Sequence, residues 1–205
     1  MDYETLKDTT TVAKTVEALK GRNITGIPVA NGAEALAKIK EMIPKGASVM
    51  NGASATLEQI GYVDYLKSGQ HGWDNPHERI LAEKDPAKQS RLRKEALLSD
   101  YYLGSVHALA ETGEYVVASN SGSQLPHHVF TSPDLILVVS TKKIMPTLAG
   151  AMDRLNTHVI PQEDARMQKV YGMGTFPSKI LISNRESPFL GRKVTILLVN
   201  ENLGF

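Results

Sequence analysis

One apolar run decides the fold of this chain: Leu135-Ile136-Leu137-Val138-Val139. A run without polar interruption is typical of a strand that is buried on both faces, as in a parallel sheet covered by helices. Other short stretches rich in apolar residues and bounded by turn residues also read as strands. They are residues 24–29, where Pro28 indicates a sheet edge, 47–50, 179–183 and 194–200. Residues 101–110 and 114–118 read as a hairpin that turns at Thr112-Gly113.

Helical patterns separate these strands. Leu6, Val12, Val16 and Leu19 form an apolar stripe that ends at Gly21. The further predicted helices are residues 31–43, opened by Asn31 with Glu34 three positions later, 57–66, 77–98 with a break at Asp85-Pro86, and 146–154 opened by Pro146. Strands that alternate with helices predict an α/β fold, with a mostly parallel sheet flanked by helices and short antiparallel additions.

The composition excludes several classes of protein. The chain has 205 residues, 23 basic and 22 acidic, so its net charge of +1 lacks the basic footprint of a nucleic-acid binder. No run of 18 apolar residues predicts a membrane span, and the first residues lack the basic start of a signal peptide. The absence of cysteine excludes disulfides, thiolate metal sites and a cysteine nucleophile. We therefore expect a cytoplasmic protein.

Two loops of small polar residues follow predicted strands. They are Asn51-Gly52-Ala53-Ser54-Ala55-Thr56 and Ser119-Asn120-Ser121-Gly122-Ser123-Gln124. A strand that turns through such residues into a helix points backbone N–H groups at one spot, where phosphates and carboxylates bind. Small polar residues are also ordinary connectors and helix caps. The pair of loops favours a ligand site, with Asn51, Gly52, Ser54, Thr56, Ser119, Ser121, Gly122, Ser123 and Gln124 as its candidate residues.

Three charged residues are further candidates. Lys142 and Lys143 follow the buried strand, and residues just past the carboxyl ends of parallel strands line the ligand crevice of open sheets. Either lysine can pair with an anion there, or both can belong to a solvated turn before Pro146. Glu111, at the hairpin turn, is the best candidate for a catalytic carboxylate, with an ordinary turn residue as the alternative.

The sequence predicts neither a bound metal nor a cofactor. His127 and His128 are adjacent and would point about 100° apart on a helix, so they could not easily share one metal ion. His71 and His77 flank Asp74 in a loop that reads as mobile, and exposed loop histidines usually bind nothing. Gly172-Met173-Gly174 lacks the third glycine and the following helix of a dinucleotide fingerprint.

The order of several segments resembles that of the LUD domain family. The segment Tyr101-Tyr102-Leu103-Gly104-Ser105-Val106-His107-Ala108-Leu109-Ala110-Glu111-Thr112-Gly113 is similar to the strand and Glu-Thr-Gly turn of that family. The buried strand followed by Lys143-Ile144-Met145-Pro146 resembles its Lys-Ile-Val-Pro segment. The tail, with Arg185-Glu186-Ser187-Pro188 and Leu198-Val199-Asn200-Glu201, is also similar to that of small members.

The resemblance implies a single LUD domain over residues 1–205, with an N-terminal helix in 1–22 and a loop and helical insertion in 70–98. It implies a three-layer fold, shared with sugar-phosphate isomerases, glucosamine-phosphate deaminases and CoA transferases. In the isomerases a loop resembling residues 51–56 binds phosphate. The second loop departs from the family pattern at Ser121-Gly122-Ser123-Gln124-Leu125-Pro126, where many members are richer in glycine.

Three functions follow as hypotheses. The resemblance implies a subunit or accessory for oxidation of L-lactate or a related 2-hydroxy acid, with iron–sulfur partner subunits that carry the electrons. The two loops and Glu111 instead fit a stand-alone isomerase, transferase or cyclo-ligase acting on a small phosphorylated or acyl substrate. A ligand-binding or scaffolding module without chemistry is the third. In each case we expect a small anionic ligand, no nucleic acid, and a homo-oligomer as a possible assembly.

Overall fold

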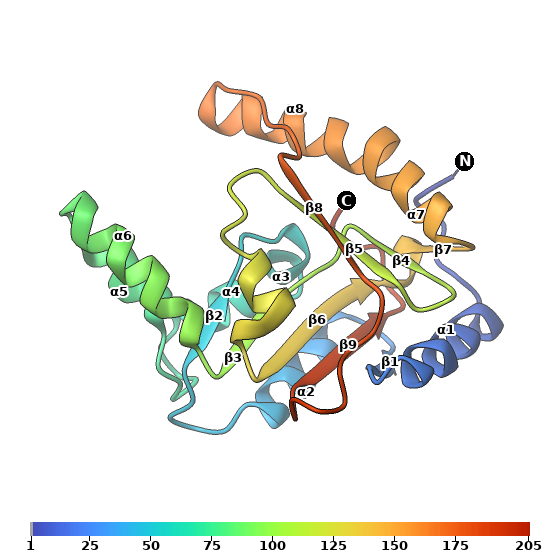
Figure 1. Cartoon of the computed structure of the whole chain (residues 1–205), viewed down its shortest axis with the longest axis horizontal. Helices are drawn as coiled ribbons and strands as arrows, with labels where there is room; N and C mark the ends of the chain where they lie inside the picture. The colour runs from blue at the N-terminus through green and yellow to red at the C-terminus, as the bar shows by residue number, and fades with distance from the viewer. Residues whose placement is uncertain (1) are drawn as a thin grey trace.

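Two β-sheets lie against each other in the computed structural model, which describes residues 2–205 (Figure 1). The larger sheet is entirely parallel, in the order β1 (Thr25–Val29), β9 (Lys193–Val199), β6 (Asp134–Ser140), β3 (Tyr101–Gly104) and β2 (Val49–Asn51). The smaller is mixed, in the order β7 (Ile144–Met145), β4 (Ala108–Ala110), β5 (Tyr115–Ser119) and β8 (Lys179–Ser183).

Strand β6 is the centre of the larger sheet, as the apolar run predicts. Its side chains alternate between two cores, because successive residues of a strand point to opposite faces. Ile136 and Val138 pack with helices α2 (Gly32–Met42), α3 (Ala55–Gln59) and α4 (Tyr62–Lys67). Leu135 and Leu137 pack with α1 (Thr9–Gly21) and the inner face of the smaller sheet. Burial on both faces explains why the run has no polar residue.

The outer face of the smaller sheet carries a third core. Val116 and Met145 pack there against α7 (Leu148–Arg154) and a π-helical turn, Leu155–Val159, that continues into α8 (Ile160–Tyr171). The α/β class with a mostly parallel sheet flanked by helices is thus confirmed. The short antiparallel additions form a complete second sheet, which separates the parallel sheet from α7 and α8 (Figure 1).

Several predicted elements differ in their pairing or bounds. Residues 101–104 do not belong to the hairpin: β3 pairs in parallel with β2 and β6, and only β4 pairs with β5 in antiparallel fashion. The predicted helix over 57–66 is split into α3 and α4 at Gly61, which has a φ of 76°. Helix α7 begins after Pro146, because the Thr147 side chain accepts a hydrogen bond from the Gly150 N–H and caps it.

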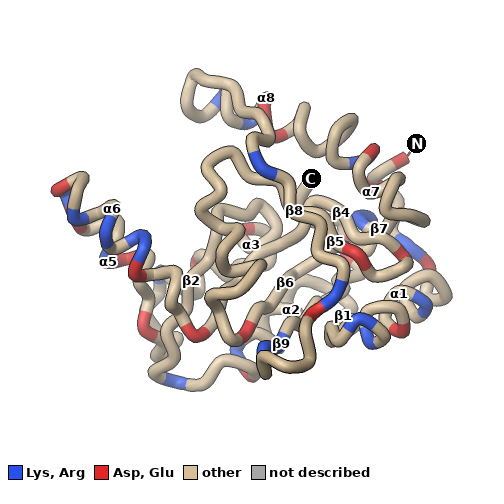
Figure 2. Tube along the Cα trace, viewed as in Figure 1, with Lys and Arg blue, Asp and Glu red and all other residues tan. Residues whose placement is uncertain are grey.

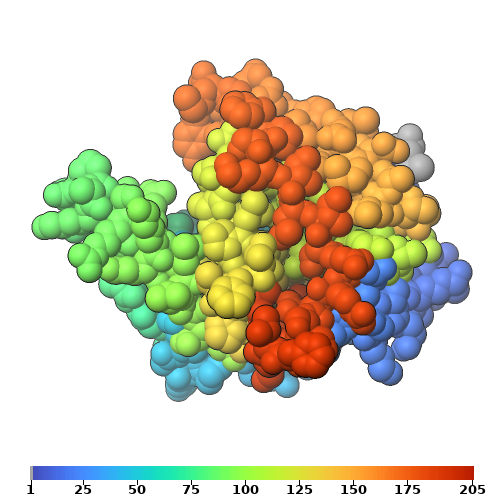
Figure 3. Space-filling view, viewed as in Figure 1, coloured from blue at the N-terminus to red at the C-terminus, as the bar shows by residue number. Residues whose placement is uncertain are grey.

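Two features at the sheet edge and surface match the prediction. Strand β1, which contains Pro28, is an edge strand. Helices α5 (Pro76–Ala82) and α6 (Pro86–Glu95) are separated at Asp85, whose side chain caps α6. They form an arm that projects from the body of the molecule (Figure 3), and α6 buries none of its residues. Acidic and basic residues alternate along this arm (Figure 2), as on a solvated surface.

Candidate functional site

A cavity of about 470 Å³ opens at the carboxyl ends of β2 and β3, beside the end of β5. One wall is polar and consists of the loops that follow these strands, together with Lys143. The opposite wall is formed by the π-helical turn, α8 and residues 175–177, and it is rich in apolar side chains such as Val159, Met167 and Phe176. Gly204 and Phe205 complete the lining. A mainly apolar lining with a few convergent polar groups is typical of a small-molecule site.

The cavity brings the two polar loops together. The candidate residues that line it are Gly52, Ser54, Thr56, Ser119, Ser123, Gln124 and Lys143. Asn51, Ser121, Gly122, Lys142 and Glu111 lie outside the lining. The structure therefore collects most of the residues that the sequence singles out, although their role in binding a ligand stays a prediction.

Tyr102 fixes the position of the first loop. A Cβ at Gly52 would lie 2.5 Å from the Tyr102 hydroxyl and 3.2 Å from Gln124 Oε1 of the second loop. Only glycine fits such an approach, so Gly52 lets the two loops meet over one tyrosine. Ser54 then caps α3 by accepting a hydrogen bond from the Leu57 N–H at 3.3 Å.

Hydroxyl groups hold the second loop in a tight turn. Ser119 Oγ accepts from the Gly122 N–H at 2.9 Å, and Ser121 Oγ lies 3.0 Å from Ser123 Oγ. Gln124 Nε2 donates to the Ala118 carbonyl oxygen at 3.1 Å. Ser121 and Gly122 thus contribute to the shape of the loop rather than to the surface of the cavity.

Lys143 supplies a buried amine to the cavity. Its Nζ lies 3.2 Å from each of three neutral oxygens, which are Thr56 Oγ1, Ser105 Oγ and the Val106 carbonyl. The residue is only 4% exposed, and no carboxylate of residues 2–205 forms an ion pair with it. Burial, followed by the nearby charges of Arg154 and Lys142, lowers the pKa of Lys143 to about 7. The amine is therefore partly neutral near physiological pH.

Lys142, the preceding residue, faces away from the cavity. Its Nζ donates to Glu4 Oε2 at 2.8 Å, to Asn202 Oδ1 at 2.6 Å and to the Gly204 carbonyl at 2.9 Å. These contacts join the N-terminal segment to the C-terminal residues. Each lysine ammonium has three N–H donors. Those of Lys142 bond a carboxylate, an amide oxygen and a carbonyl, whereas the partners of Lys143 among residues 2–205 are all neutral.

His107 and Arg154 lie near the amine. His107 lines the cavity, and its Nδ1 accepts a hydrogen bond from the Ala118 N–H at 3.1 Å. Burial, with Lys143 and Arg154 nearby, lowers the pKa of His107 to about 3, so the ring is neutral and carries its proton on Nε2. Arg154 is fully buried and donates from one Nη to the His107 carbonyl, while its Nε and other Nη have no partner among residues 2–205.

Sequence reasoning missed Ser105, His107 and Arg154. Residues 101–110 read as one strand, so the turn at residues 105–107 that carries Ser105 and His107 into the cavity was hidden. Its signal was Gly104-Ser105, a pair of small residues after an apolar stretch, as in the two loops. Arg154 is the last residue of the helix predicted over residues 146–154, and nothing in that pattern indicates its burial, which depends on the smaller sheet.

Glu111 lies at the far end of β4 from the cavity. The chain enters β4 from His107 and leaves it toward Glu111, whose backbone N–H donates to the Met145 carbonyl at 2.8 Å. Its side chain is half-buried and does not line the cavity. Its role as an acid or base stays a prediction that the position of the side chain does not favour.

His127 and His71 have separate contacts. His127 stacks on Tyr102 with ring centroids 4.2 Å apart, and His71 Nδ1 accepts from the Trp73 N–H at 2.9 Å. Asp74 pairs with Arg79. Within residues 2–205, no three His, Asp or Glu side chains converge in a way that could hold a metal ion. Over the same residues, no helix combines the length and apolar character needed to cross a membrane.

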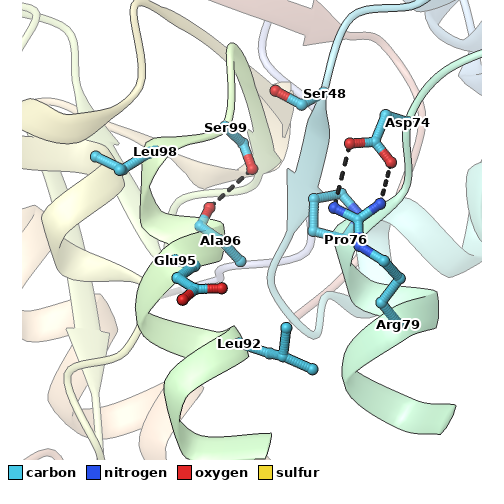
Figure 4. Close-up of a pocket in the computed structure, with 9 residues that line it drawn as sticks. All are labelled: Ser48, Asp74, Pro76, Arg79, Leu92, Glu95, Ala96, Leu98 and Ser99. Atoms are coloured by element: carbon cyan, nitrogen blue, oxygen red, sulfur yellow. Dashed lines mark hydrogen bonds and ion pairs between the residues drawn. The ribbon is translucent and has the colours of Figure 1, made fainter. Parts of the chain in front are cut away.

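A second, smaller cavity of about 160 Å³ lies where the arm joins the larger sheet (Figure 4). The carboxylate of Asp74 and the guanidinium of Arg79 pair on one side of it, and on the other side Ser99 Oγ donates to the Ala96 carbonyl at 2.7 Å. Ser48 and Glu95 of the lining are bonded to Asp100 and Arg91, so the polar side chains of this cavity already have partners and we regard it as a packing gap at the base of the arm.

Comparison with known proteins agrees with this architecture. A model of the LUD domain family matches residues 12–198, most of the chain. The chain belongs to the LUD domain family. Its structure is similar to the crystal structure of a DUF162 family protein from Deinococcus radiodurans, with a TM-score of 0.57, 12% sequence identity, and coverage of 96% of this chain and 100% of the other. At that identity the likeness concerns the fold alone. No curated protein matched the chain.

Proposed function

We propose that this LUD domain protein binds a small carboxylic acid of the 2-hydroxy or 2-oxo class in the 470 Å³ cavity. One observation carries the proposal: the Lys143 Nζ is buried at the cavity wall without an anionic partner among the described residues. A buried cation is unfavourable until it is paired, so a carboxylate that enters the cavity gains a strong charge-assisted hydrogen bond. Ser105, Thr56 and the Nε2–H of His107 add neutral groups for a neighbouring hydroxyl or carbonyl oxygen.

The cavity sets an upper limit on the size of the ligand. Its volume is at the low end of small-molecule sites, which span roughly 300–1,000 Å³. The apolar side chains of Val159, Met167 and Phe176 suit a short alkyl group such as the methyl of lactate. Glu163 already pairs with Arg166 at 2.6 Å on that wall, so Lys143 is the cation that remains for a ligand there.

The wider role is oxidation of L-lactate or a related 2-hydroxy acid in the cytoplasm, where the protein serves as a subunit or accessory of an iron–sulfur oxidoreductase. Family membership supports this role. The 205 residues contain no cysteine, so the thiolates that hold a cluster belong to partner subunits. Genes for such subunits beside this one would support the proposal.

A stand-alone enzyme acting on a small phosphorylated or acyl substrate is the second candidate. It is favoured by the pKa of Lys143, which burial lowers to about 7, because an amine with that pKa can take up and release a proton at neutral pH. Turnover by the purified chain without any partner would favour this candidate over the accessory role.

Calorimetric titration with L-lactate, pyruvate and inorganic phosphate tests the binding proposal. We expect one site for lactate or pyruvate, and a loss of about 2 kcal/mol, roughly thirtyfold in Kd, in Lys143→Met. Lys142→Met is the matched control and should keep the affinity. Because a bound carboxylate raises the pKa of Lys143, binding at pH 7.5 should also take up protons, which titration in buffers of different ionisation enthalpy measures. Equal affinity in Lys143→Met and wild type would overturn the proposal.

A further inference from the structure

Lys143 combines the features of a nucleophilic lysine, and the following inference rests on the proposed function. Its side chain is buried, its Nζ faces a cavity large enough for a small ligand, and its contacts are two hydroxyls and one carbonyl. Lysines that form Schiff bases need an amine that is desolvated and not tied up in an ion pair. Lys142 also follows β6 and is buried, but it does not meet the second condition, because it is locked to Glu4.

We propose that Lys143 captures a 2-oxo acid covalently, as an imine between its Nζ and the C2 carbonyl carbon of the ligand. The nitrogen lone pair attacks C2, the C–N bond forms and the carbonyl π electrons move to oxygen. A proton passes from nitrogen to that oxygen, giving a carbinolamine. The proton that the ammonium group released before the attack then protonates the carbinolamine hydroxyl, which leaves as water, and the nitrogen lone pair forms the C=N bond of the protonated imine. One ammonium group and one ketone thus yield one iminium ion and one water molecule.

The hydroxyls around Nζ suit each stage of this reaction. Thr56 Oγ1 and Ser105 Oγ both lie 3.2 Å from Nζ, and a hydroxyl can donate as well as accept. They can therefore bond the charged ammonium, bond the neutral amine and relay the proton to the departing oxygen. The Val106 carbonyl accepts from Nζ at 3.2 Å and keeps the amine aimed at the cavity while the hydroxyls reorient.

Charge favours a 2-oxo acid over a simple ketone or aldehyde. The iminium ion keeps the positive charge on Nζ, and the carboxylate of a 2-oxo acid is attached to the carbon that becomes bonded to it. The adduct therefore keeps the pairing between the positively charged Nζ and the ligand carboxylate that stabilises the non-covalent complex. In addition, the pKa of Lys143 of about 7 gives a neutral amine fraction at pH 7 that is about a thousandfold larger than that of an ordinary lysine.

Reductive trapping tests the proposal. Wild-type protein is incubated with pyruvate and cyanoborohydride at pH 7, and the products are read by intact mass and by peptide mapping. We expect one reduced pyruvate per chain, located at Lys143. L-Lactate, which has no carbonyl at C2, should bind without trapping, and acetone should trap far more slowly than pyruvate. Lys142→Met should trap as wild type does.

A charge-preserving variant separates this inference from the proposed function. Lys143→Arg keeps a cation at the cavity but cannot form an imine, so it should bind lactate and fail to trap pyruvate. If wild type binds pyruvate in calorimetry but yields no adduct at Lys143, covalent capture is wrong and the binding function stands. If neither acid binds and no adduct forms, both proposals fall. Adducts spread over surface lysines also contradict the inference.

Discussion

Lys142 and Lys143 follow the same strand and are 2% and 4% exposed, yet they differ in the charge of the groups that contact them. Lys142 is paired with a carboxylate, Glu4, and with two further oxygens near the C-terminal end. Within residues 2–205 the partners of Lys143 are all neutral, and this residue lines a cavity. Burial therefore does not by itself mark a functional lysine. The charge of its partners distinguishes the ion-paired Lys142 from Lys143, whose partners among residues 2–205 are neutral.

Among the variants considered, Lys142→Met should cause the largest loss of folding stability. Lys142→Met leaves the Asn202 side chain and the Gly204 carbonyl without their donor and Glu4 without its partner. Losing one member of a buried pair costs about 3–5 kcal/mol, and since Glu4 is about half exposed we expect roughly 2–3 kcal/mol in urea unfolding. Glu4→Gln should cost less than Lys142→Met. A Lys142→Met protein as stable as wild type would show that these contacts do not join the two ends of the chain.

The second-largest effect should be a pH dependence of folding stability that Lys143 causes and Lys142 does not. The pKa of Lys143 falls from its usual 10.5 to about 7 on folding, chiefly because the amine is buried. Between these values the unfolded chain holds a proton that the folded chain lacks, so stability rises with pH. From pH 7 to pH 9 this residue should contribute a gain of about 2 kcal/mol.

The gain should be absent in Lys143→Met and present in Lys142→Met. Urea unfolding of the three proteins at pH 7, 8 and 9 measures it, and the difference between the variants removes the contribution of other titrating groups. An equal gain in wild type and Lys143→Met would mean that Lys143 keeps an ordinary pKa and that its amine is not desolvated.

The comparison of the lysines also shows what the sequence could predict. The run at residues 135–139 predicts the central strand correctly, because a strand buried on both faces needs apolar residues at every position. The two polar loops are likewise visible, and the structure places them at one cavity. Both are local patterns of residue type, which a sequence displays directly.

The surroundings of the two lysines and the pairing of β3 depend on residues that are distant in the chain. Lys142 meets Glu4 across 138 positions, and Lys143 meets Thr56 across 87, so no local pattern distinguishes the two. Strand β3 is similar: its apolar residues suit a hairpin, but parallel pairing with β2 and β6 places it in the larger sheet and turns Ser105 and His107 into the cavity. Long-range pairing is thus the information that local periodicity lacks.

Gly204 contacts Lys142 and lies close to Lys143, and replacing it with alanine should cause a smaller loss of folding stability. Its carbonyl accepts from Lys142, and a Cβ on it would lie 2.8 Å from Lys143 Nζ and 2.3 Å from Thr56 Oγ1. Gly191 is a matched control, since it has the same φ of 65° and a Cβ added to it would meet nothing within 4 Å. We expect about 1 kcal/mol for Gly191→Ala from backbone strain, and about 2 kcal/mol for Gly204→Ala.

Gly204→Ala should also weaken lactate binding, because the added methyl displaces Lys143 Nζ, whereas Gly191→Ala should not. Thermal unfolding with and without lactate measures both effects. Equal costs in the two variants would indicate that the C-terminal residues move aside and do not constrain the amine.

Replacing Glu111 should have the smallest effect on stability and binding, and it tests whether the candidate site extends beyond the cavity. Its side chain lies at the far end of β4 from His107 and does not line the cavity, although the sequence makes it the best candidate for a catalytic carboxylate. We expect Glu111→Gln to change stability by less than about 0.5 kcal/mol and to leave lactate affinity and pyruvate trapping unchanged. Calorimetry and reductive trapping on this variant, beside Lys143→Arg, make the comparison direct. A clear loss of either property in Glu111→Gln would extend the functional site along β4 and restore the carboxylate as a participant.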